Sequence, residues 1–161
     1  SNVSERRLEE LRKVDFGSLP LDKAIVKVKG KGTRKLAVFS DPDCPFCKRL
    51  EPELEKLDDV TIYTFLYPLA ALHPDAMRKA TLVWCSTDRQ RAWDDLMLRG
   101  RSPEGGTLAC ATPILEIIDL AQKLGIEGTP GLVFSDGRVV PGLIPLDEIE
   151  SRLEQGAPQF W

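Results

Sequence analysis

The stretch VFSDPDCPFCKRL, residues 38–50, decides how the chain folds. It continues an apolar run, LAVF at positions 36–39, of the kind found in central strands whose two faces are both covered. From Pro45 onward, leucines recur at helical spacing at positions 50, 54 and 57, which predicts a helix. The motif Cys-Pro-Phe-Cys at positions 44–47 therefore stands where a buried strand ends and a helix begins.

The position of the two cysteines in this motif favours redox chemistry. Unpaired backbone N–H groups and the helix dipole stabilise negative charge at the start of a helix, and the thiolate is the reactive form of cysteine. Pro45 suits the first helical position, because its missing N–H would be unpaired there anyway. Cys47 lies one helical turn after Cys44. This spacing predicts that Cys44 is the exposed nucleophile and that Cys47 is the buried resolving thiol.

Segments on either side of the motif alternate between strand and helix patterns. The pair Asp136-Gly137 between two apolar runs predicts a hairpin, and the basic, glycine-punctuated stretch 27–35 is interpreted as another hairpin turn. In chain order, the expected elements are an exposed strand at 24–28, strands at 36–39 and 61–66 around the helix from Pro45, a helical stretch at 74–97, a helix at 113–124, strands at 132–134 and from 139, and a helix at 146–153. This order predicts an α/β fold with a mixed sheet covered on both faces.

The composition is that of an ordinary globular domain. The chain has 161 residues, of which 42% are hydrophobic and 29% charged, and this length fits a single domain. A net charge of −3 gives no reason to expect nucleic acid as a partner. No apolar run reaches the ~18–20 residues needed to cross a bilayer, and the polar N-terminal stretch contains no signal peptide. A soluble globular domain is therefore expected.

Four cysteines and one histidine limit the possible metal and disulfide chemistry. Structural zinc sites normally show two close pairs of ligands, but Cys85 and Cys110 are far apart and His73 has no ligand beside it. We therefore expect no metal. An even number of cysteines fits two disulfides, one local and one long-range, which persist mainly in oxidising compartments. A buried free thiol at Cys85 is the alternative.

Other residues near the motif are given structural roles. His73 precedes Pro74 and is interpreted as a loop or helix-start residue rather than a base. Asp41 and Asp43 are interpreted as loop residues exposed to water. Phe46 either contacts apolar segments of a substrate or packs at the edge of a groove, and the residues alone leave both possibilities open.

The motif, together with Gly128-Thr129-Pro130 ahead of a later strand, resembles the thioredoxin fold, which places a cis-proline opposite the two cysteines. The resemblance is more specific in three stretches, VFSDPDCPFCKRL, VWCSTDRQRAWDDLM and LGIEGTPGLVFSDGRVVPG. These are similar to the catalytic domain of the periplasmic DsbC and DsbG family of disulfide isomerases, and the match extends from about Ala24 to Leu153. It implies a thioredoxin-like fold with a helical insertion.

For the site, this resemblance implies that Cys44 attacks substrate disulfides and that Cys47 releases the mixed disulfide. No metal or organic cofactor is implied, because this dithiol itself carries the electrons. A structural disulfide in the insertion would contribute roughly 3–4 kcal/mol to stability. The implied catalytic residues are Cys44 and Cys47. The implied substrate-binding residues are Pro45, Phe46, Thr129 and a cis Pro130. The implied structural disulfide joins Cys85 and Cys110.

The implied function is that of a thiol:disulfide interchange protein, an enzyme that reduces or isomerises protein disulfides. Two alternatives are a DsbG-like reductase of oxidised single cysteines and a chaperone-like peptide-binding module in which redox chemistry is secondary. The implied partners are unfolded or misfolded disulfide-containing proteins and a membrane-bound reductant of the DsbD type. The implied compartment is the periplasm, and nucleic acid is not an expected partner.

The sequence departs from the family pattern in two respects. It lacks the N-terminal dimerisation domain, so we expect residues 1–21 to be a linker helix, over Ser4–Lys13, and a turn, with the catalytic domain at 22–161. The full-length protein is then expected to be a homodimer and this chain a monomer. The dipeptide Pro-Phe between the cysteines is closer to the DsbG type, which leaves isomerase versus reductase activity open. Compared with thioredoxin itself, Val38 takes the place of a buried acid.

Overall fold

A mixed five-stranded sheet forms the centre of the protein, with its strands in the order β1-β3-β2-β4-β5. The computed structural model describes residues 13–103 and 106–156. The strands are β1 Ile25–Lys29, β2 Arg34–Ser40, β3 Val60–Leu66, β4 Gly131–Phe134 and β5 Val139–Pro141. Strands β2 and β3 are parallel, and the other neighbouring strands pair antiparallel. The mixed sheet expected from the sequence is therefore confirmed.

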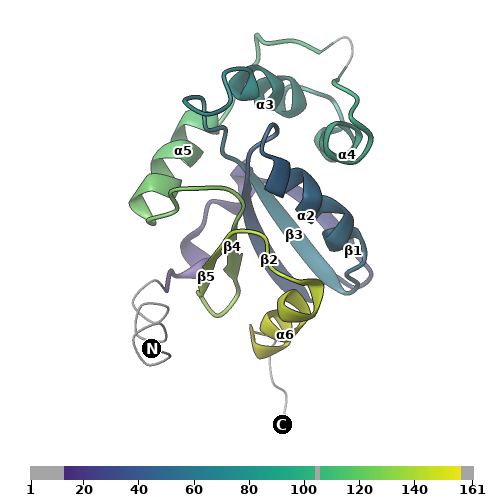
Figure 1. Cartoon of the computed structure of the whole chain (residues 1–161), viewed down its shortest axis with the longest axis vertical. Helices are drawn as coiled ribbons and strands as arrows, with labels where there is room; N and C mark the ends of the chain where they lie inside the picture. The colour runs from purple at the N-terminus through teal and green to yellow at the C-terminus, as the bar shows by residue number, and fades with distance from the viewer. Residues whose placement is uncertain (1–12, 104–105, 157–161) are drawn as a thin grey trace.

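Helices cover both faces and one end of this sheet (Figure 1). In the described part of the chain they are η1 Phe16–Ser18, η2 Leu21–Lys23, α2 Pro45–Glu55, α3 Ala76–Trp84, α4 Arg89–Arg99, α5 Ile114–Lys123 and α6 Leu146–Gly156. On one face, Leu50 of α2 and Ile149 of α6 pack on the sheet. On the other face, Ile117 of α5 and Phe16 of η1 do the same.

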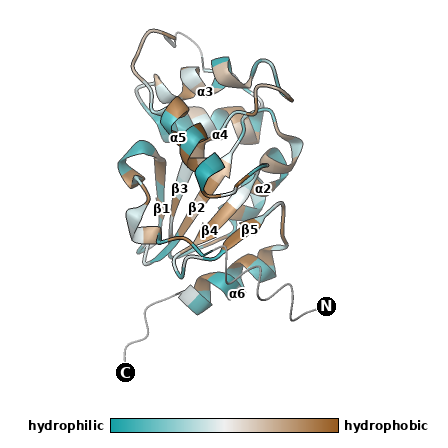
Figure 2. Cartoon of the chain, turned by 90° about the vertical axis from the view of Figure 1, so that its left-hand side faces the viewer, coloured by the Kyte–Doolittle hydropathy of each residue, from teal (hydrophilic) through white to brown (hydrophobic). Residues whose placement is uncertain are grey.

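The central strand β2 is buried on both faces, as its apolar run predicts. Its residues 36–39 are completely inaccessible to solvent, and every residue of the neighbouring strand β4 is buried. Figure 2 shows hydrophobic colours along much of both strands. This strand carries the chain straight into the segment that precedes Cys44, so the position of the motif is fixed by the best-packed part of the sheet.

The turn between β1 and β2 does not form a hairpin, so that interpretation of residues 27–35 is wrong. Strand β1 pairs with β3, which lies between β1 and β2 in the sheet. Strand β3 is almost entirely buried and needs a neighbour on each side. Strand β1 instead exposes Val26 and Val28, a pattern that suits the edge of a sheet. Burial of β3 therefore overrides the local turn signal.

The second hairpin prediction is confirmed, because β4 and β5 pair antiparallel across Asp136-Gly137. Gly137 adopts a positive φ of 91°, and its carbonyl accepts a hydrogen bond from the Val14 N–H at 2.8 Å. A Cβ at this position would lie 2.2 Å from the Val14 carbonyl oxygen. The turn therefore needs glycine both for its backbone conformation and for the close approach of the N-terminal segment.

The helical insertion consists of two helices, α3 and α4, where the sequence predicts one stretch over 74–97. The chain leaves the first helix at Trp84 and begins the second at Arg89. The Asp88 carboxylate caps the second helix by accepting a hydrogen bond from the Arg91 N–H at 3.1 Å. The cap and the disulfide at Cys85 account for the break.

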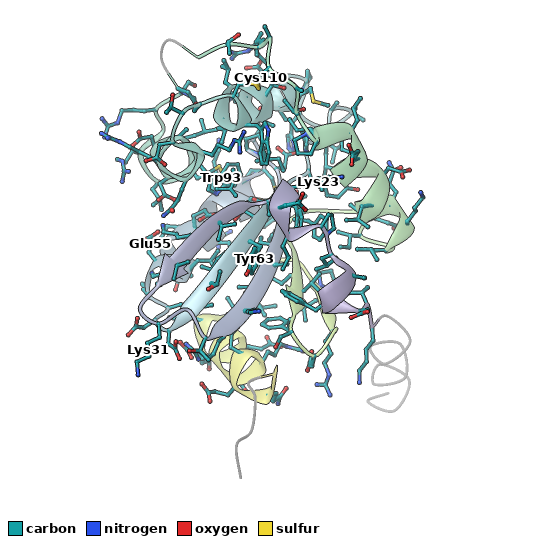
Figure 3. All side chains as sticks on the ribbon, turned by 180° about the vertical axis from the view of Figure 1, so that it is seen from behind. Lys23, Lys31, Glu55, Tyr63, Trp93 and Cys110 are labelled. Carbon is teal, nitrogen blue, oxygen red and sulfur yellow. A yellow bond between two sulfur atoms is a disulfide. The ribbon has the colours of Figure 1, made fainter. Side chains whose placement is uncertain are left out.

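A disulfide joins Cys85 to Cys110, with the two Cα atoms 5.7 Å apart. Cys85 directly follows α3, and Cys110 lies in the segment that connects α4 to α5, at the end of the molecule occupied by the insertion (Figure 3). This is the pairing that the family resemblance implies. It closes the insertion into a covalent loop.

The segment before β1 packs against the domain. Phe16 and Leu19 are buried in the cluster beneath α5. The helix expected over Ser4–Lys13 lies outside the described residues except for Lys13.

Within the described residues, no helix combines the length and apolar character needed to span a membrane.

Candidate active site

Cys44 is the N-cap of helix α2, and Pro45 occupies the first helical position. The Cys44 backbone is extended, with φ −75° and ψ 123°, and its carbonyl accepts a hydrogen bond from the Lys48 N–H at 3.1 Å. The strand-to-helix position expected for the motif is thus the one observed. Both Cys44 and Cys47 are free thiols, so the structure describes the dithiol form.

The loop containing Pro130 lies against the motif. The Thr129–Pro130 peptide bond is cis, and the Cys44 thiol donates to the Thr129 carbonyl oxygen at 3.5 Å. Only 5% of Cys44 is exposed, so the expectation of an exposed nucleophile is wrong for the dithiol form. The loop that contains Thr129 contacts the Cys44 thiol and helps to bury it. The spacing of residues near the motif could not indicate this contact, because Thr129 is 85 positions away in the sequence.

Cys47 lies deeper and is completely buried. Burial raises the pKa of its thiol to about 12, although nearby hydrogen-bond donors from Ser40, Asp41 and Thr129 act in the opposite direction. The Asp41 backbone N–H lies 3.4 Å from the sulfur and donates to it. Cys47 is therefore held as a neutral thiol at neutral pH.

This difference predicts the order in which the reduced protein reacts with an alkylating agent. We expect Cys44 to be labelled first at pH 6–7, because Cys47 has neither solvent access nor an accessible thiolate. Mass mapping after brief treatment with iodoacetamide measures the order. Faster labelling of Cys47 would contradict the assignment of the two thiols.

Asp41 is completely buried, so its interpretation as a water-exposed loop residue is wrong. One carboxylate oxygen accepts from the Asp43 N–H at 2.8 Å, and the other accepts from the Leu69 N–H at 2.8 Å. The second oxygen also lies 2.8 Å from Nδ1 of His73. Asp41 thereby ties the segment before Cys44 to the loop after β3. His73 is a loop residue, as expected, and its contact with Asp41 is part of this connection.

Asp43 is also mostly covered, with 16% of its side chain exposed. Its carboxylate forms an ion pair with Lys79 of α3 at 2.5 Å. The interpretation of Asp43 as a freely exposed loop residue is therefore wrong as well. The pair connects the helical insertion to the residue immediately before Cys44.

A buried acid, Glu51, lies one helical turn after Cys47 on α2, and the sequence interpretation missed it. Glu51 is 5% exposed and accepts a hydrogen bond from Nε1 of Trp93 at 2.9 Å. Burial raises the pKa of its carboxyl group to about 7. The signal was present in the spacing, because Glu51 is four residues after Cys47 and three before Leu54, both of which are buried.

The aromatic residue of the motif, Phe46, is 51% exposed. The Arg49 guanidinium lies 5.9 Å from the centre of its ring. Of the two open possibilities for Phe46, the structure therefore favours the exposed apolar surface. Val38, which takes the place of the buried acid of thioredoxin, is a fully buried apolar residue of β2.

An apolar groove lies beside the cis-proline loop. It is bounded on one side by the loop after β3 and on the other by α5, and Leu72 at its rim is 71% exposed. One of its lining residues, Glu127, is two positions before Thr129. Further lining residues are Tyr67, Pro68, Leu69, Ile118 and Gln122.

In residues 13–103 and 106–156, no three His, Cys, Asp or Glu side chains are grouped so that they could hold a metal ion.

Comparisons with known proteins agree on one family. A family model of the thioredoxin-like domain matches residues 21–157. The probable thiol:disulfide interchange protein DsbC of Bordetella parapertussis is 43% identical over 152 residues, covering 94% of this chain and 53% of that protein. The thiol:disulfide interchange protein DsbC of Escherichia coli K12 is 30% identical over 122 residues, covering 74% of this chain and 50% of that protein. A disulfide interchange protein from Neisseria gonorrhoeae has a crystal structure with a TM-score of 0.82 at 51% identity, covering 86% of this chain and 98% of that one.

The fold and the cysteine pair define a thioredoxin-like protein with a dithiol at the start of a helix. Within that class, the chain belongs to the DsbC-like thiol:disulfide interchange proteins and corresponds to their catalytic domain. The chain spans about half the length of the curated relatives that it matches.

Proposed function

We propose that this domain exchanges disulfides with protein substrates, with Cys44 as the nucleophile and Cys47 as the resolving thiol. The observation that carries the proposal is the placement of Cys44 at the N-terminus of α2, in contact with the cis-proline loop. A helix N-terminus favours the thiolate that must attack. The neighbouring backbone of Thr129 offers an N–H and a carbonyl group with which an extended substrate strand could pair.

The exchange proceeds in two balanced steps. The Cys44 thiolate attacks one sulfur of a substrate disulfide, forms a mixed disulfide and expels the other substrate sulfur as a thiolate, which takes a proton from water. Cys47 then loses its proton and attacks the Cys44 sulfur, which expels the second substrate sulfur. The substrate disulfide gains two electrons, and the Cys44–Cys47 dithiol becomes a disulfide. The domain needs no metal or organic cofactor for these steps.

The surface around the site supports unfolded or misfolded proteins as substrates. Exposed Phe46 and the apolar groove with Leu72 at its rim both lie on segments that adjoin the reactive residues. Unfolded chains expose apolar side chains of the kind that such surfaces bind. We assign Pro45, Phe46, Thr129 and Pro130 to substrate binding on this basis.

The similarity to DsbC proteins supports a proposal about the wider setting of this domain. We propose that residues 22–161 form the catalytic domain of a longer homodimeric protein, and that this chain alone is monomeric. Residues 1–21 would be the linker, whose last part packs onto the domain through Phe16 and Leu19. A dimer would present two dithiols to one substrate, which favours isomerisation over simple reduction. We further propose a periplasmic location and a membrane-bound reductant of the DsbD type that restores the dithiol.

The test is a variant in which Cys44 and Cys47 are both replaced by serine. We expect it to lose catalysis of disulfide reduction in a model protein with glutathione as the electron donor, while retaining any binding of unfolded chains. The control is the parent protein, assayed for reduction and for suppression of aggregation. If the double variant still accelerated reduction, the dithiol would not be the active group.

A further inference from the structure

Two buried hydroxyl groups near the active site have no ordinary hydrogen-bond partner. They are Oγ of Ser40 and Oγ1 of Thr129, and neither makes a hydrogen bond of normal geometry within the described residues. Buried hydroxyls in folded proteins are nearly always paired, so two unpaired groups at one site call for an explanation. Both lie next to the Cys47 thiol and interact with it.

The backbone fixes the Ser40 hydroxyl in place. Ser40 is the last residue of β2, stands opposite Leu66 of β3 in the sheet and is 1% exposed. Its carbonyl accepts a hydrogen bond from the Tyr67 N–H at 2.8 Å. The following residue, Asp41, directs its N–H to the Cys47 sulfur. The hydroxyl is therefore held beside the sulfur by a strand and not by a flexible loop.

We propose that Ser40, together with Thr129 and the Asp41 N–H, forms a three-donor site for the thiolate that Cys47 becomes when it releases substrate. A neutral thiol is a weak acceptor and leaves donors around it poorly satisfied, whereas a thiolate can accept several hydrogen bonds. The partner of the two hydroxyls is then a charge that exists only during turnover. Donors positioned in advance for a transient charge are a common source of catalysis.

The role of this three-donor site rests on the proposed function and applies to the second step of the exchange, in which Cys47 releases the substrate. In the mixed disulfide, the Cys44 sulfur is bonded to substrate and cannot carry a charge. It therefore no longer contributes to raising the pKa of Cys47. Cys47 gives its proton to water, its thiolate forms the bond to the Cys44 sulfur, and the bond from Cys44 to the substrate breaks. The substrate sulfur leaves with the electron pair and takes up a proton. The donors act between loss of the proton and formation of the new bond.

The experiment uses Ellman's reagent, which releases one coloured thiolate when Cys44 attacks and a second when Cys47 resolves the mixed disulfide. Stopped-flow absorbance separates the two, because only the first phase depends on reagent concentration. In Ser40→Ala we expect the second phase to slow about three- to tenfold at pH 7, since the pKa of Cys47 rises and the gain in nucleophilicity offsets only part of the loss. The first phase should stay within about twofold of the parent, which also shows that the variant is folded.

Two further variants make the result specific. Ser40→Thr keeps a hydroxyl and should retain most of the second-phase rate. Ser135→Ala removes a hydroxyl bonded to the Gly156 carbonyl, far along the chain from the motif, and should change neither phase. The role of Ser40 would be overturned by an unchanged second phase in Ser40→Ala, by equal slowing of both phases, or by Ser40→Thr as slow as Ser40→Ala. Absence of a first phase in the parent protein would overturn the proposed function itself.

Discussion

Replacing Cys44 by serine is expected to reduce the rate of disulfide exchange by at least about 1,000-fold, because the nucleophile of the first step is lost. Replacing Cys47 by serine is expected to have a different outcome. The first step still occurs, but no thiolate follows to release the substrate, so a mixed disulfide at Cys44 accumulates. Non-reducing electrophoresis and mass mapping after mixing with an oxidised model protein measure both results.

The pair of variants distinguishes the roles of the two thiols. The trapped species should disappear when dithiothreitol is added. Before that addition, the Cys85–Cys110 disulfide should remain intact in it, with neither of these two cysteines bonded to substrate. Accumulation in the Cys44 variant instead of the Cys47 variant would reverse the assignment. Accumulation in neither would show that this domain does not attack substrate disulfides.

The second large effect is on stability, at Glu51. Burial raises the pKa of this carboxyl group from 4.5 to about 7, so the folded protein holds its proton more tightly than the unfolded chain does. The associated stability is present below pH 4.5 and is lost as the pH rises through about 7. We expect Glu51→Gln to remove this loss. Its free energy of unfolding relative to the parent should increase by about 3 kcal/mol between pH 4.5 and pH 8.5.

Urea unfolding at both pH values measures this difference. Glutamine retains an oxygen that can accept from Nε1 of Trp93, so the packing between α2 and α4 is kept. Glu53→Gln is the matched control, because Glu53 lies on the same helix with 35% of its side chain exposed and pairs with Lys56 at the surface. That control should show little dependence on pH relative to the parent. A pH-independent effect of Glu51→Gln would mean that Glu51 is already ionised in the folded state.

The part of the site that could be predicted from sequence is local. Cys44 and Pro45 occupy the end of an apolar strand and the start of a leucine-spaced helix, and both signals lie within a few residues of the motif. The Asp136-Gly137 hairpin is local in the same sense. The cis-proline is different, because the residue before it contacts Cys44 from 85 positions away. Only the family resemblance indicated that contact.

The errors arise where distant partners override local character. Asp41 stands in a polar, proline-containing stretch that is typical of an exposed loop, but its partners Leu69 and His73 follow 28 and 32 residues later and bury it. Glu51 meets Trp93 across 42 residues in the same way. The edge position of β1 depends on the need of β3 for neighbours on both sides. The helical spacing could indicate that Glu51 is buried, but the partners in these contacts are too distant in sequence for local spacing to identify them.

The shared core of the reactive cysteines and the structural disulfide has a consequence for the integrity of the protein. Cys44 and Cys47 both belong to the cluster of buried side chains against which Cys110 packs. An enzyme that exchanges disulfides risks scrambling its own cross-link whenever a reactive thiolate sits within that cluster. With a pKa of about 12, Cys47 carries almost no charge at neutral pH, and thiol exchange requires that charge. The burial of Cys47 therefore removes one of the two thiolates that could attack the structural disulfide from within this core.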